Sequence, residues 1–134
     1  MADRKKELLQ AARKARKKAY APYSNFRVGA AVLAGNGKIY SGCNVENASF
    51  GLTSCAERNA IFAMIAASER EIREVLIIGE SEEFLPPCGA CRQVIAEFAK
   101  PAAKVHMCSE KGTCRSTTVG ELVPFIFHLN KEKK

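Results

Sequence analysis

Three cysteines and one glutamate have the side chains and the spacing needed for a catalytic metal centre. One residue separates Cys55 from Glu57, and two residues separate Cys88 from Cys91, about thirty positions further along the chain. Three thiolates can hold a zinc ion and leave its fourth tetrahedral position open to water, which distinguishes a catalytic zinc from a structural one. A carboxylate that is not a ligand can take up and return protons. The pattern therefore predicts a metal ion held by the cysteines, with Glu57 as the catalytic residue.

Both halves of this pattern begin a segment that is predicted to be helical. Residues 54–67 and 88–99 are rich in alanine, have recurring apolar positions and contain no internal proline. The N-terminus of a helix carries a partial positive charge, which lowers the pKa of a thiol placed there. Two helices that start at the same point would therefore favour three thiolates in one place.

The Cys-x-x-Cys pair alone is compatible with two other kinds of site. One is a redox-active pair, although such a pair needs no third cysteine. The other is a closed structural zinc site, which needs a fourth ligand. His106 lies in an apolar run, where a buried, hydrogen-bonded histidine is more typical, and His128 lies near the C-terminus. The pairing with an upstream Cys-x-Glu favours the catalytic site. The candidates for a fourth ligand are the two histidines and Cys43, Cys108 and Cys114.

Glu57 and Arg58 each have a simpler interpretation. Ser54 and Glu57 have the spacing of a capping box, in which the glutamate would only satisfy a backbone N–H group. Arg58 could be an ordinary surface residue. However, zinc with three thiolates has a net negative charge that weakens it as a Lewis acid, and an arginine that donates hydrogen bonds to the sulfurs offsets that charge. Because a helix start disfavours a cation, we favour this role for Arg58.

The positive charge is concentrated at the two ends of the chain. The 134 residues have a net charge of +7, of which +6 lies in residues 1–20 and +2 in a basic tail over residues 128–134. The part that contains the cysteine pattern is therefore almost neutral. The first segment is predicted to be a helix with Leu8 and several alanines, including Ala19, on its inner face. No aromatic residues alternate with its lysines, so we do not expect nucleic acid as a partner.

Length and composition indicate one domain over residues 1–134. The apolar fraction is 47%, with only 9 glycines and 5 prolines. No apolar run is long enough to span a membrane, and no secretory signal is expected. Outside the metal pattern, Cys43, Cys108 and Cys114 are an odd number without the spacing of a disulfide framework. We therefore expect a cytoplasmic protein with reduced cysteines.

The remaining segments predict an α/β fold in which both metal helices pack on a mixed sheet. A Gly-Asn-Gly turn joins the first two strands as a hairpin. Thr118 and Glu121 have the spacing of a capping box and predict a short helical turn. Five strands are predicted, over residues 26–34, 38–43, 75–79, 104–108 and 113–117.

Four short motifs follow one another along the chain. They are Phe-Arg-Val-Gly-Ala-Ala at residues 26–31, Gly-Cys-Asn-Val-Glu-Asn-Ala at 42–48, Cys-Ala-Glu-Arg at 55–58 and Pro-Cys-Gly-Ala-Cys-Arg-Gln at 87–93. In this order they closely resemble the short, homotetrameric, zinc-dependent cytidine deaminases. The resemblance covers roughly residues 21–127. It implies a three-layer α/β/α fold with a mixed five-stranded sheet.

The resemblance also implies an activity. It is the hydrolytic deamination of cytidine and 2′-deoxycytidine to uridine and 2′-deoxyuridine, with release of ammonia, in pyrimidine salvage. Water activated by one zinc ion per chain would attack C4 of the base, and Glu57 would act as the proton shuttle.

The motifs assign roles to individual residues by the same resemblance. Cys55, Cys88 and Cys91 would bind zinc, with Arg58 and Gln93 supporting the metal region. Contacts to a neighbouring subunit of the homotetramer would come from Ala48, Phe50 and Phe127. Contacts to the nucleoside would come from Phe26 against the base, Asn44 and Glu46 at the ribose hydroxyls, and Ala56.

Other functions remain open at this point. A related deaminase acting on a nucleoside-like antibiotic such as blasticidin S would share the metal centre, although the intact pair of Asn44 and Glu46 argues against it. These two residues could also be ordinary polar loop residues. A zinc-containing nucleic-acid-binding module would use the basic helix, and its affinity would fall steeply with salt.

Overall fold

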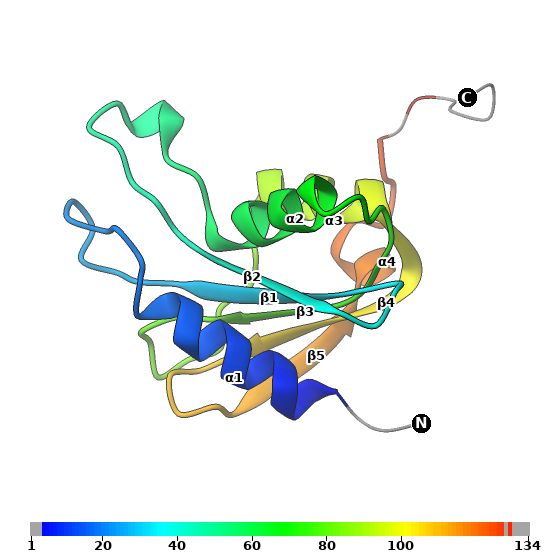
Figure 1. Cartoon of the computed structure of the whole chain (residues 1–134), viewed down its shortest axis with the longest axis horizontal. Helices are drawn as coiled ribbons and strands as arrows, with labels where there is room; N and C mark the ends of the chain where they lie inside the picture. Colours follow the sequence, from blue (N-terminus) through cyan, green and yellow to red (C-terminus); the bar gives the residue numbers. More distant parts are fainter. Residues whose placement is uncertain (1–3, 128, 130–134) are drawn as a thin grey trace.

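The structure, a computed structural model of the chain, describes residues 4–127 and residue 129. In the described part of the chain, no helix is long and apolar enough to cross a membrane. The helices and strands follow one another as shown in Figure 1: α1 (Lys5–Arg16), β1 (Gly29–Ala34), β2 (Ile39–Cys43), the short 3₁₀ helix η1 (Phe50–Leu52), α2 (Ala56–Ala66), β3 (Ile72–Ile78), α3 (Gly89–Phe98), β4 (Ala99–Cys108), β5 (Cys114–Thr118) and α4 (Val119–Leu122).

The five strands form one mixed sheet in the order β2-β1-β3-β4-β5. β3 and β4 are parallel, with α3 as the connection between them, and all other neighbouring strands are antiparallel. α1 covers one face of the sheet, and α2 and α3 cover the opposite face (Figure 1). This arrangement confirms the three-layer α/β/α fold that the sequence predicted.

A separate apolar cluster holds each face of the sheet. On one face, Leu8 and Ala12 of α1 pack against buried residues of β1, β3 and β4. Burying a leucine side chain such as that of Leu8 contributes about 1.5–3 kcal/mol. The cluster that joins α2 and α3 to the other face is larger and includes Ile61, Met64, Ile77, Ile95 and Val105. The helices that carry the cysteines are therefore fixed to the sheet by apolar contacts of their own.

The elements differ from the sequence prediction mainly at their ends. β1 begins at Gly29 rather than at residue 26, because the backbone N–H groups of residues 26–28 donate to side chains and not to a neighbouring strand. β3 and β4 begin earlier than expected, and α1 ends before Ala19. The capping box of Thr118 and Glu121 is present at the start of α4, as predicted.

The expectation that all cysteines outside the metal pattern are reduced is wrong. A disulfide joins Cys108 to Cys114, whereas Cys43 is free. The two bonded residues lie directly opposite each other in the register of β4 and β5. They meet because residues 109–113 form a tight turn between these strands. The register of the β4–β5 hairpin therefore brings the two cysteines together, which the number of cysteines in the sequence does not indicate.

Candidate metal centre and active site

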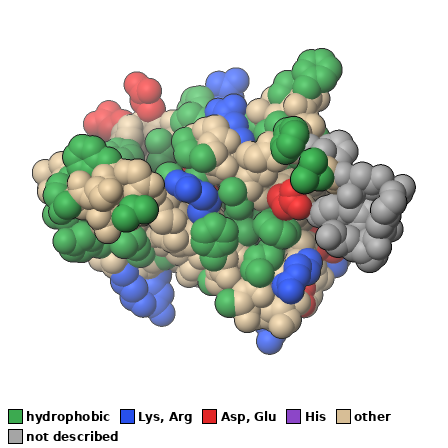
Figure 2. Space-filling model, turned by 90° about the horizontal axis from the view of Figure 1, so that it is seen from above, with side chains coloured by type: hydrophobic (Ala, Val, Ile, Leu, Met, Phe, Trp, Pro, Cys, Tyr) green, Lys and Arg blue, Asp and Glu red, His purple; other side chains and the backbone are tan. Residues whose placement is uncertain are grey.

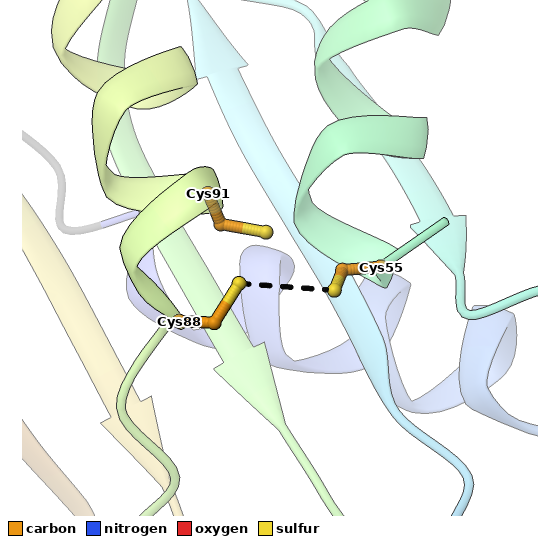
Figure 3. A group of neighbouring side chains, drawn as sticks. All are labelled: Cys55, Cys88 and Cys91. Carbon is orange, nitrogen blue, oxygen red and sulfur yellow. Dashed lines mark hydrogen bonds between the residues drawn. The ribbon is translucent and has the colours of Figure 1, made fainter. Parts of the chain in front are cut away.

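The three cysteines converge where α2 and α3 begin. Cys55 is the N-cap residue of α2, Cys88 is the N-cap residue of α3, and Cys91 lies in the first turn of α3. Figure 3 shows their side chains directed toward one another, with Cys55 Sγ and Cys88 Sγ 3.9 Å apart. All three Sγ atoms lie within 4.8 Å of one another. A tetrahedral zinc with Zn–S bonds of about 2.3 Å requires sulfurs at such separations, so the donor set fits this ion.

The surroundings of the cluster favour negative charge on the sulfur of Cys55. Hydrogen bonds with Cys91 and Arg58 lower the pKa of Cys55 to about 5. The hydrogen bond with Cys55, together with burial, raises the pKa of Cys91. Arg58 Nη2 donates to Cys55 Sγ at 3.4 Å, and Arg58 Nε is buried without a hydrogen-bond partner in the described part of the chain. These contacts support the expectation that Arg58 offsets the charge of the thiolates.

Glu57 is buried beside the cysteines, with 5% of its surface exposed. Burial raises the pKa of Glu57 to about 7, so its carboxyl group can both accept and release a proton near neutral pH. The capping box of Ser54 and Glu57 is not formed, because Cys55 is the N-cap residue of α2 and the N–H group of Ser54 donates to the carbonyl oxygen of Val45. The Ser54 hydroxyl instead donates to Asn59 Oδ1 at 2.7 Å.

A cavity of about 190 Å³ adjoins the cysteines. It brings together residues from both metal helices and from the segments that precede β1 and follow β2. The expected substrate contacts Phe26, Asn44 and Ala56 all line it, as does Glu57. We name it the zinc-side cavity. The remaining lining residues are Val28, Thr53, Cys55, Leu85, Pro86 and Cys88.

Asn44 is buried and binds the backbone with both ends of its amide. Asn44 Oδ1 accepts from the N–H group of Val28, and Nδ2 donates to the carbonyl oxygen of Phe26, both at 2.9 Å. Asn44 therefore fixes the segment that carries the Phe26 ring. The amide oxygen has a second lone pair and the nitrogen a second hydrogen, so a contact with a ligand hydroxyl remains available.

Glu46 lies in an adjoining cavity of about 360 Å³ and does not line the zinc-side cavity. Thr53 lines both cavities. Glu46 Oε1 accepts from the N–H groups of Tyr23 and Ser24 at 2.9 and 3.1 Å, and Oε2 accepts from the Ser24 hydroxyl. The hydrogen bond from this hydroxyl lowers the pKa of Glu46. Asn44 and Glu46, both expected at the ribose hydroxyls, thus line two neighbouring cavities.

The other expected contact residues lie outside the zinc-side cavity. Gln93 Nε2 donates to the carbonyl oxygen of Phe127 at 2.8 Å. Ala48 is exposed, and Phe50 and Phe127 are 75% and 70% exposed. Contacts of these residues with another subunit therefore stay a prediction.

His106 does not belong to the cysteine cluster. His106 is buried, and its ring nitrogens lie 2.6 Å from Ser116 Oγ and 2.8 Å from Glu74 Oε1. This confirms the interpretation of His106 as a hydrogen-bonded core histidine. His128 lies outside the described residues.

Sequence reasoning missed part of the cavity wall. Leu85 and Pro86 line it from the loop that precedes Cys88, and Thr53 lines it from the loop that precedes Cys55. These residues could have been predicted as cavity residues only because they lie close in sequence to Cys55 and Cys88. Nothing in the sequence indicates that Ser24 and Glu80 hold the backbone next to Phe26.

Comparison with known proteins assigns the chain to a family. The family described as "Cytidine and deoxycytidylate deaminase zinc-binding region" matches residues 2–109. The chain belongs to this deaminase family. The expected enzyme class and the expected zinc cofactor are therefore confirmed, and the cysteine cluster is the site that fits the ion.

Individual relatives cover almost the whole deaminase chain. It is 45% identical over 121 residues to a cytidine deaminase of Sporosarcina psychrophila, a match that covers 90% of this chain and 89% of the relative. Among solved structures, it resembles a cytidine deaminase from Burkholderia pseudomallei with a TM-score of 0.88 and 47% identity, over 95% of this chain and 100% of that one. For the cytidine deaminase of Mycobacterium tuberculosis, the TM-score is 0.80 at 35% identity, over 92% and 97%.

Proposed function

We propose that the chain catalyses the hydrolytic deamination of cytidine and 2′-deoxycytidine to the corresponding uridines, with release of ammonia. The observation that supports this most strongly is one cavity lined by metal-binding cysteines, a buried glutamate with a raised pKa and an aromatic ring. The cytidine deaminases among its relatives support the choice of nucleoside. We further propose a role in pyrimidine salvage, as the family resemblance implies; the cytoplasmic location expected from reduced cysteines loses that support, because Cys108 and Cys114 form a disulfide.

The cysteines and Glu57 divide the chemistry between them. Zinc bound by Cys55, Cys88 and Cys91 supplies the Lewis acidity that makes water nucleophilic near neutral pH. Glu57 accepts a proton from the water that adds to C4 of the base, delivers one to N3, and assists protonation of the departing amino group. One water is consumed and one ammonia is released.

The other residues of the cavity bind and orient the nucleoside. Phe26 packs against the base, and Asn44 holds the backbone that directly follows this ring. Asn44 and Glu46 face the sugar from neighbouring cavities that share Thr53. Arg58 keeps a positive charge beside the sulfurs, which limits the negative charge at the metal.

We also propose that the active enzyme is a homotetramer, in which neighbouring subunits cover the open side of this region. Large apolar side chains are exposed in the loops around residues 20–25 and 45–53: Tyr20, Tyr23, Val45, Phe50 and Leu52. Figure 2 shows apolar side chains gathered at the left end of the molecule, where Figure 1 places these loops. Exposed apolar patches of this kind are typical of interaction surfaces. Light scattering should give the mass of four chains, and a monomer would contradict the proposal.

The proposed activity is tested by ammonia release from cytidine, with zinc measured on the same sample. We expect release with about one zinc per chain, as three protein ligands and one open position require. If the protein binds zinc but releases no ammonia from cytidine or 2′-deoxycytidine, the proposed substrate is contradicted. A nucleoside-like antibiotic such as blasticidin S is then the favoured substrate.

A matched pair of cysteine variants tests the metal ligands. Cys88→Ser should lose most of the zinc and the activity. Cys43→Ser changes a free cysteine that lies outside the cluster, so it should retain both. Equal zinc content in the two variants would contradict the assignment of Cys88.

A further inference from the structure

The segment that carries the Phe26 ring is held by side chains and not by the sheet. Residues 26–28 precede β1, and each of their backbone N–H groups donates to a different side chain. Ser24 Oγ accepts the first at 3.0 Å, Glu80 Oε1 the second at 2.9 Å, and Asn44 Oδ1 the third at 2.9 Å. We name residues 26–28 the strap. Ser24 lies shortly before the strap, Asn44 follows β2, and Glu80 comes from the loop between β3 and Cys88, 53 positions from Arg27.

Glu80 binds residue 27 in two distinct ways. Its Oε1 accepts from the backbone N–H of Arg27, while its Oε2 accepts from Arg27 Nε at 3.1 Å and Nη2 at 2.8 Å. The guanidinium contacts are part of an ion pair in which the Arg27 side chain is 50% exposed, and exposed ion pairs stabilise little. A hydrogen bond from the main chain to a charged carboxylate is stronger and fixes the backbone directly.

Two walls of the zinc-side cavity meet beside this bond. A Cβ atom added to Gly79 would lie 2.8 Å from Leu85 Cδ2 and 2.9 Å from Phe26 Cζ. The Phe26 ring and the Leu85 side chain therefore both lie against Gly79, the residue that directly precedes Glu80. A movement of Glu80 relative to the strap would change the spacing of these two cavity walls.

We propose that Glu80 is a positioning residue for substrate binding, which holds the Phe26 ring against the Leu85 wall through the backbone N–H of Arg27. The inference rests on the proposed function, in which the base lies in the zinc-side cavity. Glu80 does not line that cavity and acts only through the strap. In the proposed function the ring packs against the base and takes no part in proton transfer, so its displacement should weaken binding and leave the chemical step unchanged.

Four variants separate the main-chain bond from the ion pair. Glu80→Ala removes both, Arg27→Met removes only the ion pair, and Glu80→Gln keeps an oxygen acceptor for the backbone N–H. Glu82→Ala changes an exposed glutamate of the same loop and is the control. The measurements are KM and kcat for cytidine, the Kd of uridine by calorimetry, and the zinc content. If Glu80→Ala does not fold, as judged by circular dichroism, Glu80→Asp replaces it, since its shorter side chain cannot span both contacts.

We expect Glu80→Ala to raise KM and the Kd of uridine by about tenfold, with kcat within about twofold of wild type and zinc unchanged. Arg27→Met, Glu80→Gln and Glu82→Ala should each change KM and Kd by less than about threefold. Unchanged binding in Glu80→Ala, equal losses in Glu80→Ala and Arg27→Met, or a loss of zinc would overturn the inference. A wild-type protein that neither deaminates cytidine nor binds uridine would instead count against the proposed function.

Discussion

Burial gives Glu57 its proton-transfer range and has a measurable effect on stability. Its folded pKa of about 7 lies above the ordinary value of 4.5 because the cavity disfavours the charged form. A raised carboxyl pKa contributes stability that is fully present below pH 4.5 and is lost as the pH rises to 7. The metal-free wild type should therefore lose on the order of 3 kcal/mol over this interval relative to Glu57→Gln.

Urea unfolding of both metal-free proteins between pH 4 and 8 measures this difference. Comparing the variant with wild type cancels the titration of groups that both proteins share. Parallel stability curves would show that Glu57 does not carry a raised pKa. In the zinc-loaded proteins, Glu57→Gln should retain the metal and lose turnover.

The contact between Arg58 and Cys55 leads to a second prediction at the scale of single residues. Arg58→Gln removes the positive charge that lies 3.4 Å from Cys55 Sγ. Loss of such a hydrogen bond beside metal ligands costs roughly 10–100-fold in activity or metal affinity. Steady-state kinetics and zinc titration measure the loss, and Arg73→Gln, an exposed change on β3, is the control. Equal rates for the two variants would remove Arg58 from the metal centre.

The close approach of β2 to α2 fixes the height of the first metal helix above the sheet. A Cβ atom on Gly42 would lie 2.5 Å from the backbone nitrogen of Ala60 and 2.9 Å from the carbonyl oxygen of Ala56. Backbone atoms cannot rotate away as side-chain ends can, so Gly42→Ala must push α2 outward. Overpacking of this kind costs about 1–3 kcal/mol. The displaced helix carries Cys55, so zinc affinity should fall together with stability.

Gly51→Ala is the matched control, because no atom lies within 4 Å of the added Cβ and its φ is not in the left-handed region. Thermal unfolding and zinc titration should leave this variant close to wild type. A Gly42→Ala protein with unchanged zinc affinity would show that α2 tolerates the shift without moving the cysteine.

Zinc bound by the three cysteines, as proposed, would link α2 to α3, so its removal should affect the whole molecule. A ligand that binds only the folded state stabilises it in proportion to the logarithm of its concentration over Kd. Stabilisation by several kcal/mol corresponds to a Tm shift on the order of 10 °C for a domain of this size. Calorimetry with and without a chelator measures the shift. Cys88→Ser should show almost none, and a chelator-insensitive Tm in wild type would contradict a linking role.

Different parts of this molecule were predictable from sequence to different degrees. The cysteine cluster was predictable because Cys55, Cys88 and Cys91 mark the starts of two alanine-rich segments without internal proline, both of which form helices. The bond between Glu80 and Arg27 was not, since it joins loops 53 positions apart and depends on how the sheet brings them together. The disulfide required the strand register, which the turn over residues 109–113 determines.

The position of β3 between the two halves of the cysteine cluster leads to an expectation about when the protein can acquire its metal. Cys55 precedes this strand and Cys88 follows it, 33 positions later, and β3 lies between β1 and β4 in the sheet. Long-range strand pairing requires loops to close before it stabilises the chain. We therefore expect the three sulfurs to meet once β3 has paired in its register with β1 and β4. A chain with a misplaced central strand is then expected to bind zinc weakly, because it lacks the complete set of ligands.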